Sequence, residues 1–431
     1  MSYLLIENNG ELDISSLVLL GASTKRGDSS KIGFFGSGNK YAIATLLRKG
    51  IPFKIFSGEK EVSIETEPVD FRGVTFKKIL IDGQQTSLTT DMGPQWEPWM
   101  AIREWVSNSI DEGEHNMITS TDNVSGREGY TRFFVYHDPS ITEMIENWNL
   151  YFTFDRDDML HENSRGKIFT QTEKDSQLVL YRKGIRAFFS SGWKSLYQYD
   201  SPSFDINESR LIDNMYSTSS TVSKLLAECT NVDVCKNILN KAFKEETWES
   251  SLPWRWGPSN GLSSAWKEAI GNHVLIVDNV AGYFLDIQHA MPHYIVSIEM
   301  AQQIKRSFSD SKIYGMDDGG DLVAFKKVEP TAKEQYLLKE CLNFCQETKY
   351  DISYPVEIVE FEQSAVLGKA HQGKILLSNK VFNEGRKQIV LTLVEENEHL
   401  KTGYKDCTRT FQNHLFSLFL SEKEERFGFF L

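Results

Sequence analysis

Cysteine and long apolar runs are scarce in this sequence. There are five cysteines, and no two of them form a C-x-x-C pair: Cys229, Cys235, Cys341, Cys345 and Cys407. This pattern favours a reducing compartment and argues against a cysteine zinc site, because both disulfide frameworks and such zinc sites need paired cysteines. No window approaches about eighteen uninterrupted apolar residues, so we expect no secretion, no membrane span and a cytoplasmic location.

Positive charge is also in deficit. Lysine and arginine number 47 against 60 aspartates and glutamates, which gives a formal net charge of −13. Such a surface repels nucleic acid on average, so bulk nucleic-acid binding is not favoured. The chain has 431 residues, 40% of them hydrophobic, which is typical of globular proteins and allows about two to four domains.

One stretch stands out against this background. It is Ile32–Leu47, IGFFGSGNKYAIATLL, in which Gly33, Gly36 and Gly38 run directly into an apolar-periodic helix pattern. Glycines let backbone N–H groups approach an anion, and a helix start adds unsatisfied donors and a positive dipole end. Lys40 would add a mobile charge. The spacing matches neither the Walker loop nor the dinucleotide fingerprint. It predicts a phosphate-binding loop, with a plain glycine turn before a core helix as the alternative.

A second stretch, Trp99–Glu112, places polar residues along one face of a predicted helix. Glu104, Asn108 and Asp111 fall at positions i, i+4 and i+7 and so share that face. A carboxylate one turn from a carboxamide suits phosphate chemistry. Glu104 would act as general base toward the attacking water, and Asn108 would offer an oxygen to Mg²⁺. A solvated helix face is the alternative.

Together with Tyr3–Lys25, these stretches resemble the GHKL ATPase superfamily, which includes gyrase, MutL, histidine kinases, MORC proteins and large heat-shock chaperones. The family's G-x-x-G-x-G motif matches the three glycines, and its E-x-x-x-N helix matches REWVSNSIDEG (Arg103–Gly113). Its D-x-G-x-G motif is degraded here. In the family the E-x-x-x-N helix comes first, so the resemblance implies a circularly permuted α/β sandwich. It also implies ATP and Mg²⁺ as ligands and a protein client or partner, and it is compatible with a homodimer.

The resemblance assigns positions near the base. A predicted strand delivers Asn8 and Gly10 to the site. Asn8 stands where the family has the aspartate that binds adenine, and Leu12 stands where a glycine is usual. An Asn oxygen still accepts from the adenine amino group, although the amide also presents a donor, which leaves base specificity open. A simple Asn-Asn-Gly turn is the alternative. Thr86 loosely matches the threonine that closes the family's pocket.

Two lysines complete the expected site. Lys25, in the polar segment STKRGDSSK, is the candidate contact from a mobile lid. Lys183, in the turn YRKGIR, lies in a predicted second α+β domain at residues 129–213. In several family members a lysine from such a domain reaches the γ-phosphate. For both residues, an exposed loop lysine is the alternative.

Strand and helix patterns organise the rest of the first three quarters. PFKIFS, KEVSIETEP and GVTFKKILI alternate with period two and predict consecutive antiparallel strands in a nucleotide-binding domain at residues 1–128. Residues 214–330 form a helical or mixed region of unassigned role. His289 and His293 stand four apart there, but Pro292 between them undermines a metal-bearing helix, so we interpret them as structural or surface histidines.

The C-terminal region, residues 331–431, resembles a minimal zinc-metallopeptidase module. Its predicted helix carries EENEH, in which Glu395 replaces the first histidine of H-E-x-x-H. Glu396 keeps the general-base position and His399 the second ligand position. A carboxylate can ligate zinc, yet two-histidine helices are the rule for hydrolytic sites, and a third ligand is not identifiable. We therefore expect a degenerate, non-catalytic module without zinc, with an active peptidase as the alternative.

The sequence thus predicts a multidomain α+β protein. Its parts would be a permuted GHKL-type sandwich, a second α+β domain, a helical middle and a small peptidase-like module. The expected function is Mg²⁺-dependent ATP binding with slow hydrolysis that drives a conformational or association switch. Two alternatives stay open: a nucleotide-sensing module without turnover, favoured by Asn8 and Leu12, and a zinc peptidase gated by nucleotide.

Overall fold

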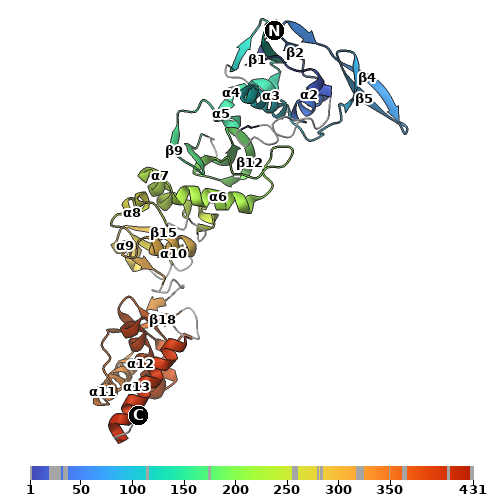
Figure 1. Ribbon diagram of the computed structural model, residues 1–431. Coiled ribbons are helices and arrows are strands. Elements are labelled where there is room, and N and C mark those ends of the chain that lie inside the picture. The colour runs from blue at the N-terminus through green and yellow to red at the C-terminus, as the bar shows by residue number, and fades with distance from the viewer. Residues whose placement is uncertain are drawn as a thin grey trace. The chain divides into compact units, whose positions relative to one another are not determined.

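The computed structural model describes residues 2–18, 31–32, 37–112, 116–172, 176–254, 261–278, 281, 285–316, 325–348, 350–361, 366–404 and 408–427. They form helices and several separate sheets, so the predicted α+β class is confirmed (Figure 1). Two compact units divide the chain, Met1–Thr221 and Val222–Leu431. The permuted arrangement and the four predicted domain limits stay predictions. No helix of the described residues combines the length and apolarity needed to cross a membrane.

A five-stranded antiparallel sheet forms the centre of the first unit. Its order is β3-β2-β8-β1-β7, and its strands are β1 (Tyr3–Asn9), β2 (Phe53–Ser57), β3 (Lys60–Val62), β7 (Asn116–Thr121) and β8 (Tyr130–Tyr136). Successive side chains of a strand point to opposite faces. Leu4 and Ile6 accordingly pack in the main core, whereas Leu5 packs with Phe56 and Phe134 in a separate cluster. Both faces of β1 are therefore covered.

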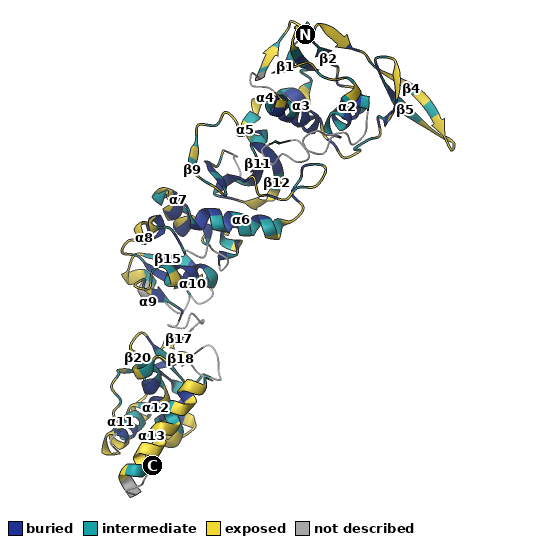
Figure 2. Ribbon diagram, viewed as in Figure 1, coloured by how far each residue is buried: buried dark blue, intermediate teal, exposed yellow. Residues whose placement is uncertain are grey.

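Two helices supply much of the main core. α2 (Gly38–Lys49) and α3 (Pro98–Glu112) pack against each other, and Figure 2 shows that much of both is buried. α2 ends at Gly50, whose left-handed φ of 69° lets its N–H donate to carbonyls of the last turn. The Ser109 hydroxyl of α3 donates to the carbonyl of Glu7 in β1 at 3.0 Å. Shorter helices in this unit are α1 (Ser15–Val18), α4 (Pro139–Glu146) and α5 (Trp148–Tyr151).

The strands after β3 form a separate antiparallel sheet. Its order is β4-β5-β6, with β4 (Ile64–Phe71), β5 (Val74–Ile81) and β6 (Gln84–Thr89). The predicted run of antiparallel strands is thus confirmed, but Ser63 divides it between two sheets. One end of this sheet is anchored because Ile79, Ile81 and Leu88 join the main core. The opposite end, around the turn between β4 and β5, is exposed (Figure 2).

A second five-stranded sheet completes the first unit. Its order is β12-β11-β13-β10-β9, and its strands are β9 (Met159–Asn163), β10 (Gly166–Thr170), β11 (Gln177–Arg182), β12 (Ile185–Lys194) and β13 (Tyr197–Asp200). β11 pairs with β13 in parallel, and the other neighbours are antiparallel. Lys183 and Gly184 form the turn between β11 and β12, with φ of 51° and 82°. Two successive positive φ values are what a tight two-residue hairpin turn needs.

The second unit contains a small parallel sheet of order β15-β14-β16. Its strands are β14 (Val274–Val277), β15 (His293–Val296) and β16 (Ile313–Tyr314). The helices of this part are α6 (Met215–Ala227), α7 (Val232–Asn237), α8 (Ser264–Ile270), α9 (Leu285–Ala290) and α10 (Ile298–Ser307), with a π-helical turn at Ile238–Ala242 and a 3₁₀ turn at Trp248–Ser251. Every residue of β14 is buried, as expected for a parallel strand covered on both faces.

A mixed sheet of order β17-β18-β20-β19 lies in the C-terminal part. Its elements are β17 (Phe325–Lys327), α11 (Ala332–Glu347), β18 (Val356–Phe361), β19 (Gly368–His371), β20 (Lys374–Ser378), a 3₁₀ turn at Asn379–Asn383, α12 (Arg386–Thr402) and α13 (Arg409–Phe427). α11 begins with a capping box, in which Thr331 and Glu334 exchange side-chain and backbone hydrogen bonds. The predicted EENEH helix is present as α12.

Candidate functional site

The structure brings the end of the glycine loop against the helix that carries Glu104. Gly38 is the first residue of α2, and a Cβ added to it would lie 2.0 Å from Glu104 Oε2. One residue later, Asn39 Oδ1 accepts from Asn108 Nδ2 at 2.8 Å across 69 residues of sequence. The two predicted stretches therefore meet at the start of α2 (Figure 1). Unsatisfied N–H groups and the positive dipole end favour an anion at such a place.

Asp111 and Lys183 reach the beginning of the same loop. Asp111 Oδ1 accepts from Ile32 N at 2.7 Å, and the Asp111 carbonyl accepts from Lys31 Nζ. Lys183 Nζ donates to the carbonyl of Lys31 at 2.7 Å from the turn between β11 and β12. The second sheet thus places Lys183 beside Lys31, and its contact with a γ-phosphate stays a prediction. Three predicted site residues lie outside the described residues: Lys25, Gly33 and Gly36.

Glu104 is buried and both of its oxygens are engaged by arginine. Oε1 accepts from Arg103 Nη2 at 3.3 Å, and Oε2 accepts from Arg210 Nη2 at 2.6 Å. Arg210 follows β13 and is 106 residues further along the chain. A water molecule would have to share these oxygens with two guanidinium groups. In this arrangement Glu104 therefore cannot act as a general base until one of its oxygens is released.

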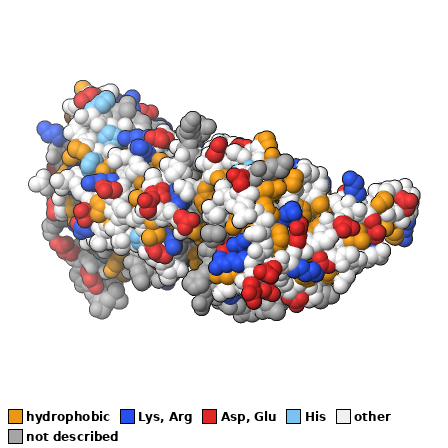
Figure 3. All heavy atoms as spheres, turned by 90° about the horizontal axis from the view of Figure 1, so that it is seen from above, with side chains coloured by type: hydrophobic (Ala, Val, Ile, Leu, Met, Phe, Trp, Pro, Cys, Tyr) orange, Lys and Arg blue, Asp and Glu red, His pale blue; other side chains and the backbone are white. Residues whose placement is uncertain are grey.

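Arginine side chains dominate the charge around Glu104. Burial lowers the pKa of Arg103 to about 10; the Glu104 charge opposes this, whereas Arg210 and Arg186 add to it. Among the described residues, Arg103 Nε, Arg103 Nη1 and Arg210 Nη1 are buried without a hydrogen-bond partner. Leaving such donors unsatisfied is costly. On the face shown in Figure 3, acidic and basic side chains are interspersed. The buried guanidinium groups of Arg103 and Arg210, by contrast, offer hydrogen-bond donors that suit an anion.

Lys40 is not the mobile charge that the sequence suggested. It is 2% exposed, and its Nζ donates to the carbonyl of Ser16 in α1 at 2.8 Å. Burial also lowers its pKa. The sequence pattern could not show this, because the carbonyl that fixes the ammonium group comes from a different element. Lys40 thus ties α2 to α1.

The residues predicted near the base make local hydrogen bonds. Asn8 is buried at the end of β1, where its Nδ2 donates to the carbonyl of the next residue at 3.0 Å. Gly10, with a φ of 102°, donates to the carbonyl of Gly129 at 2.8 Å. The Thr86 hydroxyl donates to the carbonyl of Ile79 at 2.6 Å. These bonds place the three residues in the first unit, and their contacts to a base stay predictions.

The peptidase-like helix presents its predicted residues in different surroundings. Glu395 is exposed, whereas the His399 ring stacks on Phe411 with 3.8 Å between ring centroids. His399 Nδ1 also lies 2.6 Å from the carbonyl oxygen of Tyr404, and Glu396 accepts from a backbone N–H of β19 at 2.6 Å. Within the described part of the chain, no group of three or more His, Cys, Asp or Glu residues is placed to hold a metal. A zinc site at Glu395 and His399 stays a prediction.

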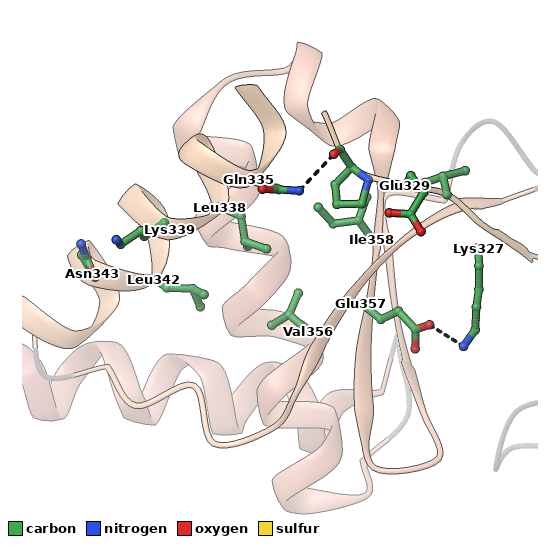
Figure 4. A pocket seen from close by; sticks show the side chains of 12 residues that line it. Lys327, Glu329, Gln335, Leu338, Lys339, Leu342, Asn343, Val356, Glu357 and Ile358 are labelled. Carbon is green, nitrogen blue, oxygen red and sulfur yellow. Dashed lines mark hydrogen bonds and ion pairs between the residues drawn. The ribbon is translucent and has the colours of Figure 1, made fainter. Parts of the chain in front are cut away.

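A cavity of about 750 Å³ lies elsewhere, between α11 and β18 (Figure 4). It is lined by Lys327, Val328, Glu329, Pro330, Gln335, Leu338, Lys339, Leu342, Asn343, Val356, Glu357 and Ile358. Lys327 and Glu357 form an ion pair of 2.9 Å at its side. None of the predicted site residues lines this cavity.

Sequence reasoning missed four contributors to the cluster at α2 and α3. They are Ser37, Arg103, Glu208 and Arg210. Arg103 directly precedes Glu104, and a charged residue on the apolar side of a helix pattern was a signal that could have found it. Glu208 and Arg210 lie in a polar NESR segment, which reads as a solvated turn. No local signal distinguishes that turn from others.

No protein-family model matches the chain, and a search of curated proteins finds no match.

Proposed function

We propose that the first unit binds ATP with Mg²⁺ and hydrolyses it slowly, as a switch of conformation or association. One observation carries the proposal. The start of α2 at Gly38 and Asn39 meets Glu104 and Asn108 of α3, and the turn with Lys183 contacts Lys31, which precedes the glycine loop. The buried arginine donors beside them support a polyanionic ligand rather than a neutral one.

Each residue has a distinct task in this proposal. The start of α2 binds phosphate oxygens through backbone N–H groups, and Lys183 adds a positive charge beside the loop. The Asn108 side-chain nitrogen donates to Asn39, so the Asn108 side-chain oxygen is the atom that can bind a cation. Mg²⁺, when bound, neutralises phosphate charge. Glu104 orients and deprotonates the attacking water once an oxygen is released from its arginines.

A second candidate is nucleotide sensing without turnover. The double engagement of Glu104 by Arg103 and Arg210 favours it, because a water molecule would have to displace a guanidinium group to reach either carboxylate oxygen. If the arginines stay in place when nucleotide binds, the site recognises phosphate but does not activate water. The two candidates share the binding step and differ in phosphate release.

The first prediction separates binding from chemistry on α3. Glu104→Gln keeps the shape of the side chain but cannot take a proton, so phosphate release should fall about 100-fold or more while ATP affinity stays within a few-fold. Asn108→Ala should instead weaken ATP binding in the presence of Mg²⁺ and have little effect without the metal. Glu112→Gln, an exposed carboxylate on the same helix, is the matched control and should change neither property.

Calorimetry with ATP and a phosphate-release assay measure the two properties. A wild-type chain that does not bind ATP would refute the proposed function. A wild-type chain that binds ATP without releasing phosphate would instead establish the sensing candidate. A Glu104→Gln variant that turns over at the wild-type rate would show that Glu104 is not the general base.

A further inference from the structure

A compact turn after β13 reaches across to the glycine loop. Ile206 and Ile212 form an isolated antiparallel bridge, and Leu211 N donates to Asn207 Oδ1 at 3.1 Å inside it. Arg210 adopts a left-handed φ of 56° and is 7% exposed. Ile212 N also donates to a carbonyl of β12 at 2.9 Å. The turn, residues 206–212, is thus closed on itself and fixed to the second sheet; we call it the latch.

Two charged side chains of the latch end at the predicted site. Glu208 Oε1 accepts from the hydroxyl of Ser37, the residue just before α2, at 3.1 Å. The Glu208 charge contributes to raising the pKa of Tyr41 in the first turn of α2, after the larger effect of burial. Arg210 holds Glu104 Oε2 at 2.6 Å. A carboxylate therefore sits where a phosphate is expected, and a guanidinium occupies the expected general base.

We propose that the latch closes the nucleotide site by substituting for nucleotide. In this reading, which rests on the proposed function, Glu208 occupies the anion position at the start of α2, and Arg210 holds Glu104 inactive. Phosphate groups of an entering nucleotide displace Glu208 from Ser37. They also offer Arg210 a new anionic partner, which frees Glu104. The latch thus links release of the general base to the presence of phosphate.

The strengths of these contacts fit displacement by a ligand. Glu208 is exposed, and one hydrogen bond of this kind corresponds to about two- to tenfold in an equilibrium constant. A triphosphate brings several negative charges and can outcompete one such bond. The Nη1 atoms of Arg210 and Arg103, which are buried without a hydrogen-bond partner among the described residues, would gain hydrogen bonds when a triphosphate binds. The latch therefore lowers nucleotide affinity without preventing binding.

Glu208→Ala tests the latch, with Asp213→Ala as the matched control. Both remove one exposed carboxylate from the same segment, but only Glu208 contacts Ser37. Titration calorimetry with ATP and Mg²⁺ should show about two- to tenfold tighter binding for Glu208→Ala. Asp213→Ala should stay within about twofold of wild type, because exposed charges at a distance are screened.

The outcomes separate the latch from the function on which it rests. If wild type binds ATP and Glu208→Ala binds it no more tightly, the latch is refuted and the nucleotide site stands. If Asp213→Ala tightens binding as much as Glu208→Ala, general charge explains the effect and the latch is again refuted. If neither wild type nor Glu208→Ala binds ATP, both proposals fall. If Glu208→Ala binds ATP and wild type does not, both the nucleotide site and the latch are supported.

Discussion

Asp200 is the side chain that fixes the turn carrying Lys183. Its Oδ2 accepts from Gly184 N at 2.7 Å and from the Thr153 hydroxyl at 3.0 Å. Asp200 is 5% exposed, and burial raises its pKa, while these two hydrogen bonds oppose the rise. Ionising the Asp200 carboxyl therefore costs stability, which makes the turn sensitive to pH.

We expect Asp200→Asn to change how stability depends on pH. Below the ordinary carboxyl value of 3.8, the side chain is protonated in both states and its contribution to stability is fully present. That contribution is lost as the pH rises through the raised pKa of the folded state. Between the two pKa values the unfolded chain binds fewer protons than the folded chain, so stability falls as the pH rises. Asparagine does not titrate. The free energy of unfolding of Asp200→Asn minus that of wild type should become more positive from about pH 4 to about pH 7, measured by urea denaturation.

Thr153→Val provides the opposite change at the same carboxylate. It removes a hydrogen bond that favours the ionised form, so the pKa of Asp200 should rise further. Its free energy of unfolding minus that of wild type should become more negative over the same pH range. Differences that stay constant with pH in both variants would contradict the assignment of this titration to Asp200.

At Gly38, helix α2 lies so close to Glu104 of helix α3 that there is no room for a side chain. An added Cβ would lie 2.0 Å from Glu104 Oε2 and 2.8 Å from Glu104 Cδ. Glu104 is not free to swing aside, because Arg103 and Arg210 hold its two oxygens in a buried position. The absence of a side chain at this position is therefore what allows the two helices to share one charged cluster.

We expect Gly38→Ala to lower the stability of the chain by about 2 kcal/mol or more. Breaking a buried ion pair costs about 3–5 kcal/mol, whereas alanine gains at most about 1 kcal/mol over glycine in a helix. For a unit of this size the midpoint of thermal unfolding should fall by about 4–8 °C. Gly192→Ala is the control, since an added Cβ there meets only Ser190 Oγ at 3.9 Å. Equal midpoints for Gly38→Ala and wild type would show that Glu104 is not held in place.

The division of the molecule runs through α6. The first unit ends at Thr221 and the second begins at Val222, both within this helix. The C-terminal half of α6 belongs with the second unit, because Trp266 Nε1 donates to the carbonyl of Leu226 at 2.9 Å and Ser263 N donates to that of Ala227 at 2.9 Å. A fragment that contains only the first unit should therefore end before α6.

We expect a fragment of residues 1–213 to fold alone and to bind ATP within about threefold of the full chain. It contains the three sheets of the first unit and the whole cluster of Glu104, Lys183 and Arg210. Circular dichroism on heating tests folding, and calorimetry tests binding. A fragment that unfolds cooperatively but has lost the affinity of the full chain would show that the second unit contributes to the site.

Elements with strong local signals were predictable. The helix after the glycines, the helix with Glu104 and the alternating strands around residues 53–81 are present as expected. The parallel strand β14 was missed, although its run VLIV is the continuous apolar pattern typical of such strands. The division of the strands at Ser63 had no signal, since the alternation of side chains does not say which sheet a strand joins.

The sequence by itself determined the pieces of the candidate site: a glycine-rich helix start, a Glu and an Asn one turn apart, and a lysine in a tight turn. Glycine freedom and helical periodicity act over a few residues, so they can be read from neighbours along the chain. Only the tertiary structure decided that Gly38 touches Glu104, that Lys40 is buried, and that Arg210 reaches Glu104 across 106 residues. Charges paired over such separations leave no local pattern, because the pairing depends on how sheets and helices pack rather than on spacing.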